Sequence, residues 1–308
     1  MEVVQDTVSH ISEAYEGFVA ISDPRVSDWL LMESPLPTIV ITLVYLLMVY
    51  WGPKVMKSRE PFELKGVMMI YNLGCVVLSL YIVVECIYCG YMAEYNVQCQ
   101  PVSYSDNQYE VRIAKAMWWF YFSKCIEMLD TFFFIVRKKN SQLSFLHVYH
   151  HASMFLLWWI GVKWVAGGQS WFGALMNSFI HFIMYSYYFL SACGPLFHKY
   201  LWWKRYLTQL QLTQFFIGFA HCIQSLYFDC DFPKWMHYAL LIYATSITTL
   251  FFNFYIHAYI KRERLPKLES MTCMRTTAQG DTNGNVNGSA KSTHNGSMNG
   301  HIENKKSK

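Results

Sequence analysis

The chain has 308 residues, of which 54% are hydrophobic, 18% aromatic and only 15% charged. This balance excludes an ordinary soluble domain, in which about a quarter of the residues are charged. The formal net charge of +4 comes from residues 261–308, which hold nine Lys and Arg against four Asp and Glu. The rest of the chain is therefore close to neutral, and no basic surface for nucleic acid is implied.

Seven apolar runs follow one another along the chain, and most are close to the ~20 residues that a membrane-spanning helix needs. The runs cover about 35–52, 66–92, 113–136, 145–166, 170–193, 205–228 and 236–259. We therefore expect an all-α polytopic membrane protein with seven transmembrane helices. The expected organisation is an N-terminal segment at 1–34, a membrane domain at 35–260 and a tail at 261–308.

Basic residues lie mainly in alternate connections between these runs. The connections at 52–65, 137–139, 199–205 and 261–267 hold fourteen Lys and Arg. The opposite side holds only Arg25, Arg112, Lys115, Lys163 and Lys234. Because cytoplasmic connections are enriched in Lys and Arg, this asymmetry predicts a luminal N-terminus and a cytosolic C-terminus.

The tail beyond Met271 is rich in Asn, Gly, Ser and Thr. Such a composition buries too little apolar surface to offset the entropy of ordering, so we expect the tail to be largely disordered. Its last four residues include Lys305 and Lys306, which resemble a dilysine retrieval signal of the endoplasmic reticulum. The alternative is an ordinary basic tail end, but a cytosolic C-terminus favours the signal and hence an endoplasmic reticulum membrane location.

Two of the nine cysteines, Cys99 and Cys230, fall in connections that this topology places in the lumen. Because that compartment is oxidising, we predict a disulfide between them.

Three histidines near the start of the fourth run, His147, His150 and His151, are spaced so that they share one face of a helix. Polar groups at this depth are costly and indicate a functional site by default. Further polar stripes occur at Lys124, Glu127, Asp130 and Thr131, at Asn177, His181, Tyr185 and Tyr188, and at Thr208, Gln211 and Gln214.

Polar side chains can also simply hold membrane helices together, each hydrogen bond contributing about 0.6–2 kcal/mol. That reading suits a single Gln or Thr. It is weak for Glu127 and Asp130, because the insertion penalty of such a charge is about 2.5–3.5 kcal/mol.

An imidazole cluster can bind a metal or carry out acyl chemistry. The histidines are too few for the two-iron site of membrane desaturases, and no H-E-x-x-H motif supplies a zinc site with a base. We therefore expect no metal. An imidazole can instead act as general base or as the nucleophile that accepts an acyl group, and Asp130 could orient one of the histidines.

These motifs together resemble the signature of the ELOVL family, the elongases of very-long-chain fatty acids. The motifs are Lys124-x-x-Glu127-x-x-Asp130-Thr131, His147-x-x-His150-His151, His181-x-x-Met184-Tyr185-x-Tyr187-Tyr188 and Thr208-x-x-Gln211-x-x-Gln214. The resemblance runs from about residue 25 to 260, and the stretches 158–169 and 199–208 look like the fourth vertebrate subfamily, which extends the longest chains.

The resemblance implies an acyltransferase for the condensing step of fatty acid elongation, with CoA thioesters as substrates and no cofactor. Acyl-CoA and malonyl-CoA would give 3-oxoacyl-CoA, CO2 and CoA. It also implies that six of seven helices form a barrel around a closed acyl tunnel. Other elongases and the reductases and dehydratase of the elongation cycle are the implied partners within the membrane lipid.

We hypothesise that His150 accepts the acyl group while Asp130 orients a neighbouring histidine. The residues expected at the reacting centre are His147, His150, His151, His181, Glu127, Asp130 and Asn177. The residues expected to bind substrate are Lys124, Arg137, Tyr187, Lys204, Arg205, Gln211, Gln214 and Lys261; of these, Arg137, Lys204, Arg205 and Lys261 suit the CoA phosphates, and Tyr187 could stack on adenine.

Two other classes share some of these features. A histidine-box desaturase or hydroxylase would need iron and oxygen. A seven-span receptor would share the topology, but it has little reason to gather four histidines and two carboxylates near the cytosolic face. A transporter would predict internal repeats, and none is evident.

Overall fold

The computed structural model describes Asp6, His10 and residues 16–261. The predicted disordered tail, with Lys305 and Lys306, lies outside these residues. The chain divides into two compact units, Met1–Tyr259 and Ile260–Lys308. All that follows concerns the first unit.

The first unit is helical, and the described part of the chain contains no β-strand. The long helices are α2 (Leu36–Val55), α3 (Lys65–Met92), α4 (Gln108–Glu127), α6 (Phe145–Val165), α7 (Ser170–Cys193), α9 (Lys204–Tyr227) and α10 (Lys234–Tyr255). Shorter elements are η1 (Pro24–Val26), η2 (Met56–Ser58), α5 (Leu129–Val136), η3 (Asn140–Gln142), α8 (Pro195–His198) and the π-helical η4 (Ile256–Lys261). The predicted apolar runs thus correspond to helices, with ends that differ by a few residues.

Three of the helical stretches are long and apolar enough to cross a membrane. They are Leu36–Ser58, Lys65–Met92 and Lys234–Lys261, with mean hydropathies of 1.7, 2.2 and 1.5. The protein is therefore an all-helical, multi-pass membrane protein. The helices α4, α6, α7 and α9 carry the polar stripes noted in the sequence, which lower their hydropathy.

The third predicted run, 113–136, is not one helix. It is divided at Met128 into α4 and α5, and the Met128 N–H bonds to carbonyls in the preceding turn at Cys125. Glu127 is the last residue of α4 and Asp130 lies in the first turn of α5. The break therefore falls between the two carboxylates that the sequence had placed on one continuous stripe.

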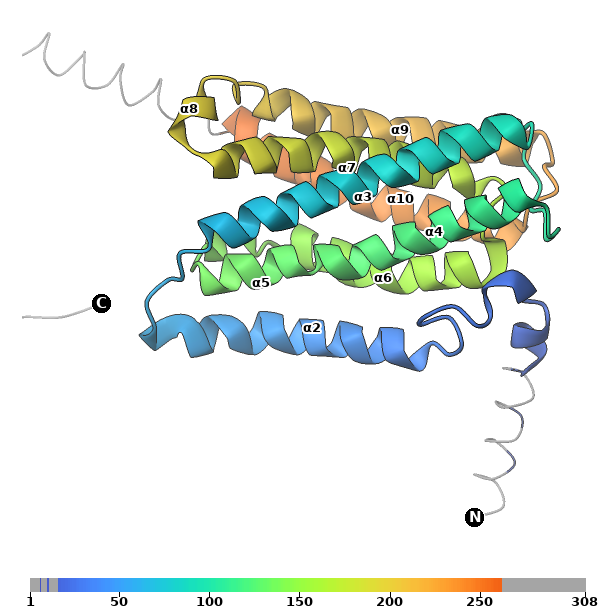
Figure 1. The fold of residues 1–308 in the computed structure, drawn as a ribbon, viewed down its shortest axis with the longest axis horizontal. Helices are drawn as coiled ribbons and strands as arrows, with labels where there is room; N and C mark the ends of the chain where they lie inside the picture. The colour runs from blue at the N-terminus through green and yellow to red at the C-terminus, as the bar shows by residue number, and fades with distance from the viewer. Residues whose placement is uncertain (1–5, 7–9, 11–15, 262–308) are drawn as a thin grey trace, which may run out of the picture. The chain divides into compact units, whose positions relative to one another are not determined.

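The long helices lie side by side in Figure 1, and α3 crosses close to α7 in the centre of that view. The two run antiparallel. Gly90 near the end of α3 meets Trp171 in the first turn of α7, and the Trp171 indole donates to the Cys86 carbonyl at 2.7 Å. A Cβ at Gly90 would lie 2.8 Å from the indole ring, so this close approach requires glycine.

The two ends of the helical unit differ in their residues, and we call them the disulfide end and the histidine end. At the disulfide end, Cys99 in the α3–α4 connection and Cys230 in the α9–α10 connection form a disulfide, with their Cα atoms 5.4 Å apart. At the opposite, histidine end, α6 and α9 begin and α7 terminates, because each of these helices runs the length of the unit in alternating direction.

The segment before α2 is held against the disulfide end by side-chain donors from the helices. Indole N–H groups and one ammonium donate to the backbone carbonyls of Phe18, Leu30, Leu31 and Met32 at 2.8–3.1 Å. The donors are Trp118, Trp159, Trp164 and Lys163. Arg25 adds an ion pair with the buried Asp23 and a bond to the Ala166 carbonyl.

Candidate active site

Polar side chains from α4, α5, α6 and α7 meet in the half of the unit nearer the histidine end. Glu127 is at the centre of one network. Its Oε1 accepts hydrogen bonds from the Lys124 ammonium at 2.9 Å and from Nδ1 of His181 at 3.1 Å. The Ser123 hydroxyl donates to the same oxygen at 3.2 Å. Because a carboxylate only accepts, Nδ1 of His181 carries a hydrogen and Nε2 is left as the basic nitrogen of the neutral ring.

Lys124 lies inside this network, not at a surface. Only 2% of its side-chain area is exposed, and its ammonium also donates to Oδ1 of Asn177 at 3.1 Å. Burying a lysine at this depth is tolerable because Glu127 neutralises it. Lys124 was expected to bind substrate, but here it links Glu127 on its own helix to Asn177 on α7.

Asp130 has a different partner from the one expected. Its Oδ2 accepts a hydrogen bond from the Tyr185 hydroxyl at 2.7 Å. In the described residues no hydrogen bond joins Asp130 to a histidine. In this structure Asp130 therefore pairs with Tyr185, and the predicted contact with a histidine of the triplet is not seen. Glu127 is the carboxylate that contacts an imidazole.

The histidine triplet occupies the first two turns of α6. Ser144 caps this helix by accepting a hydrogen bond from the His147 backbone N–H at 3.2 Å. Nε2 of His147 lies 2.7 Å from the Thr131 hydroxyl, which in turn contacts Tyr45. The ring of His151 lies between its neighbours, with ring centres 4.4 Å from His147 and 5.5 Å from His150.

His150 is the histidine of the triplet that lines a cavity. The cavity has a volume of about 240 Å³ and lies between α6, α7, α9 and α10. Asn177 and Gln214 share the wall near His150, and the remainder is mostly apolar and aromatic. The Tyr243 hydroxyl of α10 lies 3.4 Å from Nδ1 of His150. An apolar cavity with a basic nitrogen on its wall can hold an alkyl chain with a reactive carbon beside that nitrogen.

The basic residues predicted to bind CoA phosphates are distributed around the histidine end. Arg137 follows α5, and Lys204 and Arg205 begin α9, where both are exposed. Lys261 belongs to the second unit and is not placed relative to these side chains.

Of the three other residues expected to bind substrate, two contact other residues of the protein and one lines the cavity. Tyr187 is largely buried, its hydroxyl donates to the Leu201 carbonyl, and its ring packs edge-on against Trp203. The Gln211 amide contacts the sulfur of Met184, whereas Gln214 lines the cavity.

Within residues 16–261, no group of three or more His, Cys, Asp and Glu side chains is arranged to hold a metal ion. The histidines that are close together share contacts with hydroxyl groups and with a lysine-paired carboxylate instead.

Sequence reasoning missed several residues of the site. Tyr243 is the clearest case, because α10 carries several other hydroxyl side chains close to it, among them Thr245 and Ser246, and nothing in their spacing distinguishes Tyr243. Nothing in the sequence distinguished Tyr45 on α2 as a residue of the site either. Tyr185 was visible in the α7 stripe, four residues after His181, but its pairing with Asp130 was not foreseen.

The chain matches the model of the GNS1/SUR4 family, ELO, over residues 30–267. It is 57% identical over 267 residues to the human protein named very long chain fatty acid elongase 4. The aligned residues cover 87% of this chain and 85% of the human protein. The mouse protein of the same name is 56% identical over 284 residues, 92% of this chain and 89% of its own. The rat very long chain fatty acid elongase 2 is 48% identical over 240 residues, 78% of this chain and 85% of its own.

Proposed function

Since this chain belongs to the GNS1/SUR4 (ELO) family, we propose that its site carries out the condensing step of fatty acid elongation. A long or very-long-chain acyl-CoA and malonyl-CoA give 3-oxoacyl-CoA, CO2 and free CoA. The names of the relatives support this activity. The observation in the structure that carries the proposal is the His150 ring on the wall of a mostly apolar cavity.

The first stage of the proposed mechanism is acyl transfer to His150. The Tyr243 hydroxyl lies at Nδ1, so Nε2 is the nitrogen that attacks the thioester carbon. A C–N bond forms as the C–S bond breaks, and CoA leaves as the thiol after taking up the imidazole proton. Dividing the reaction in this way replaces one difficult step by two easier ones.

In the second stage malonyl-CoA occupies the vacated CoA site. Loss of CO2 leaves an enolate, whose carbon attacks the acyl carbon on His150. The new C–C bond forms as the C–N bond breaks, and the electron pair returns to the imidazole, which takes up a proton from water and becomes neutral again. The unprotonated Nε2 of His181, whose Nδ1–H is held by Glu127, would assist proton transfer on the neighbouring helix. The amide N–H of Asn177, whose oxygen is held by Lys124, would polarise the carbonyl groups.

The roles of the carboxylates differ from the initial hypothesis. Glu127 positions His181 and balances the charge of Lys124, and Asp130 positions Tyr185. The His151 ring lies next to the rings of both His147 and His150.

We place the CoA moiety at the histidine end, where Arg137, Lys204 and Arg205 can meet its phosphates. The same end is then cytosolic and the disulfide end luminal, as the distribution of basic residues predicts. The acyl chain runs from His150 toward the disulfide end in a seven-span arrangement, with six helices around the chain.

The location follows from this orientation. An N-terminus in the lumen and a lipid substrate favour the endoplasmic reticulum membrane. Other elongases and the enzymes that reduce and dehydrate the 3-oxo product are the partners that this chemistry requires. No metal or cofactor beyond the CoA thioesters takes part in the proposed steps.

The test is an assay of purified full-length protein with malonyl-CoA and a series of acyl-CoAs, in the presence of EDTA. We expect 3-oxoacyl-CoA two carbons longer than the substrate, detected by mass, at the same rate with and without the chelator. His257→Ala, which alters an exposed histidine of η4, should retain this activity. Activity that requires iron and oxygen and disappears with EDTA would instead support a desaturase and contradict the proposal.

A further inference from the structure

The helix α2 lies at one edge of the helical unit, beside α5 and α6 (Figure 1). Most of its apolar side chains are exposed, whereas Thr38, Thr42 and Tyr45 are buried. Their spacing of four and three residues places them on one face of the helix. Because lipid gives little hydrophobic drive for membrane helices to associate, hydrogen bonds from this face and close packing hold α2 in place.

Two of these buried side chains reach hydroxyl groups on other helices. The Thr38 hydroxyl lies 2.7 Å from the Tyr121 hydroxyl of α4. The Tyr45 hydroxyl lies 3.1 Å from the Thr131 hydroxyl of α5. The second contact continues into the candidate active site, because Nε2 of His147 lies 2.7 Å from the same Thr131 hydroxyl.

The Thr131 hydroxyl is the link between α2 and the histidine triplet. Thr131 is fully buried, and a hydroxyl can donate one hydrogen bond and accept two, so its contacts with Tyr45 and His147 form together. The helices are also close here, since a Cβ at Gly52 of α2 would lie 2.8 Å from the Ile135 side chain of α5. The contact with Tyr45 therefore fixes the place of the hydroxyl that orients the His147 ring.

The oriented His147 ring packs between α5 and the rest of the triplet. Its centre lies 5.2 Å from that of Phe134 and 4.4 Å from that of His151. The His151 ring is in turn 5.5 Å from the ring of His150, which lines the cavity. Because closely packed side chains transmit small displacements, a rotation of His147 would disturb the two other histidines.

We propose that Tyr45 and Thr131 are positioning residues for the reaction, and that α2 contributes to catalysis through them. The two hydroxyls orient His147, whose ring keeps His151 and His150 in the arrangement that acyl transfer needs. The inference rests on the function proposed above, because it takes His150 as the residue that accepts the acyl group. The structure describes all of α2, and none of its residues lines the cavity, so its effect on the reaction passes through these contacts.

The test compares the steady-state elongation of one acyl-CoA by purified full-length wild-type protein and by Tyr45→Phe, Thr131→Val and Thr131→Ser. Tyr45→Phe and Thr131→Val should each lower kcat by about two- to tenfold, the equivalent of one hydrogen bond. Neither should raise the KM for acyl-CoA, because neither side chain lines the cavity. Thr131→Ser retains the hydroxyl and should recover most of the wild-type kcat.

The double variant Tyr45→Phe, Thr131→Val tests whether the two hydroxyls act along one path. Because Tyr45 reaches His147 through Thr131, the double variant should have the same kcat as Thr131→Val alone. A loss equal to the product of the two separate losses would show that the residues act independently and would overturn the proposal.

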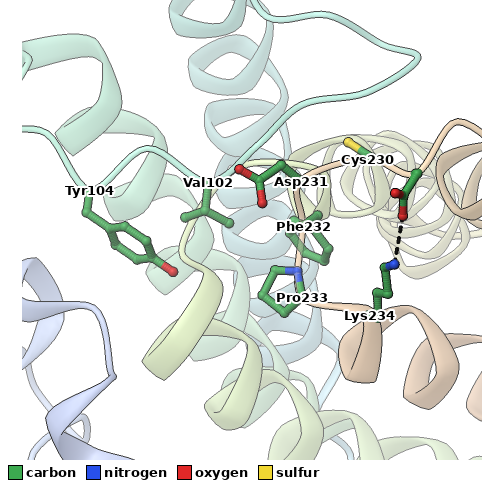
Figure 2. Close-up of a pocket in the computed structure, with 8 residues that line it drawn as sticks. Val102, Tyr104, Cys230, Asp231, Phe232, Pro233 and Lys234 are labelled. Atoms are coloured by element: carbon green, nitrogen blue, oxygen red, sulfur yellow. Dashed lines mark ion pairs between the residues drawn. The ribbon is translucent and has the colours of Figure 1, made fainter.

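Two other tyrosines supply matched controls. Tyr121→Phe removes the hydroxyl that contacts Thr38, which is the other contact described above between α2 and its neighbours. Tyr104 lines a pocket at the disulfide end (Figure 2), and its hydroxyl donates to the Trp164 carbonyl of α6 at 3.0 Å. Tyr121→Phe and Tyr104→Phe should both keep the wild-type kcat, because neither contact leads to a histidine of the triplet.

Wild-type kcat in both Tyr45→Phe and Thr131→Val would overturn the proposal. An equal loss of kcat in Tyr121→Phe would also overturn it, because α2 would then act only by stabilising the fold. If the wild type forms no 3-oxo product at all, the proposed function fails, and this outcome is distinct from an active protein that does not respond to substitution of Tyr45 and Thr131.

Discussion

Glu127 and Asp130 stand three residues apart, but each has its own partner. Glu127 accepts hydrogen bonds from Lys124 and His181, and Asp130 accepts one from Tyr185. A charge in the membrane is tolerated when it is paired and hydrogen-bonded. The Glu127 network meets both conditions, so that the carboxylate orients an imidazole while it neutralises an ammonium.

Glu127→Gln should abolish most of the activity. The amide keeps the size of the side chain, but it leaves the buried Lys124 ammonium without a counter-ion, which costs about 3–5 kcal/mol when one partner of a buried pair is removed. We expect turnover to fall by about 10²-fold or more, as for loss of a positioned acid–base group, and the thermal unfolding temperature to decrease. Ser123→Ala, which removes a hydrogen bond to the same oxygen but no charge, is the control. Wild-type turnover in Glu127→Gln would contradict the role of the network.

Tyr243→Phe tests the contact at His150. The substitution removes only the hydroxyl that lies 3.4 Å from Nδ1, so it should lower kcat/KM by about two- to tenfold, the equivalent of one hydrogen bond. Steady-state kinetics with one acyl-CoA gives the value. Tyr238→Phe removes an exposed hydroxyl from the same helix and should have no effect. Equal kinetics for the two variants would show that Tyr243 does not act on His150.

At the scale of the helices, the apolar runs of the sequence were sufficient to predict where most of them lie. The first and last residues of these runs agree to within a few residues with those of α2, α3, α6, α7, α9 and α10. The runs did not reveal the break at Met128, because Met and Leu are good helix formers and no Pro or Gly marks the position. The separate partners of Glu127 and Asp130, His181 and Tyr185, also could not be predicted from helical spacing, because both carboxylates had been assigned to one stripe.

The contacts between helices could not be predicted from the sequence either. The histidine triplet, the α7 stripe and the pair of carboxylates were visible because helical spacing gathers polar groups on one face. Tyr243 joined the site only because α10 packs beside α6, and one sequence does not tell which helices become neighbours.

The packing of α3 on α7 depends on Gly90. Gly90→Leu should destabilise the protein by about 1–3 kcal/mol, because its side chain would overlap the Trp171 indole. Gly74→Leu is the matched control on the same helix, since no atom lies within 4 Å of the Cβ that it introduces. Thermal unfolding in detergent monitors both variants. A larger loss of stability in Gly74→Leu than in Gly90→Leu would contradict the close approach.

At the scale of the whole helical unit, cross-links gather at the disulfide end. The Cys99–Cys230 disulfide joins residues separated by 131 positions, and four helix side chains hold the segment before α2. The histidine end instead carries the exposed basic residues of α9. One end of the helical unit is therefore held together by cross-links between distant segments, whereas the other presents basic side chains.

The double variant Cys99→Ser, Cys230→Ser should be less stable than the wild type by about 2–5 kcal/mol, because the unfolded chain loses a constraint across a long loop. A reducing agent should lower the unfolding temperature of the wild type and leave that of the double variant unchanged. Cys193→Ser, which alters a free cysteine, is the control. Wild-type stability in the double variant would show that the disulfide does not hold the closed end together.

The most direct test of the account is the mass of the protein after incubation with acyl-CoA alone, without malonyl-CoA. We predict a covalent increase equal to one acyl group, located by fragmentation on His150, absent in His150→Ala and retained in His257→Ala. Addition of malonyl-CoA should discharge the group as 3-oxoacyl-CoA. Full elongation activity in His150→Ala, or an acyl group on another residue in the wild type, would contradict the proposed role of His150.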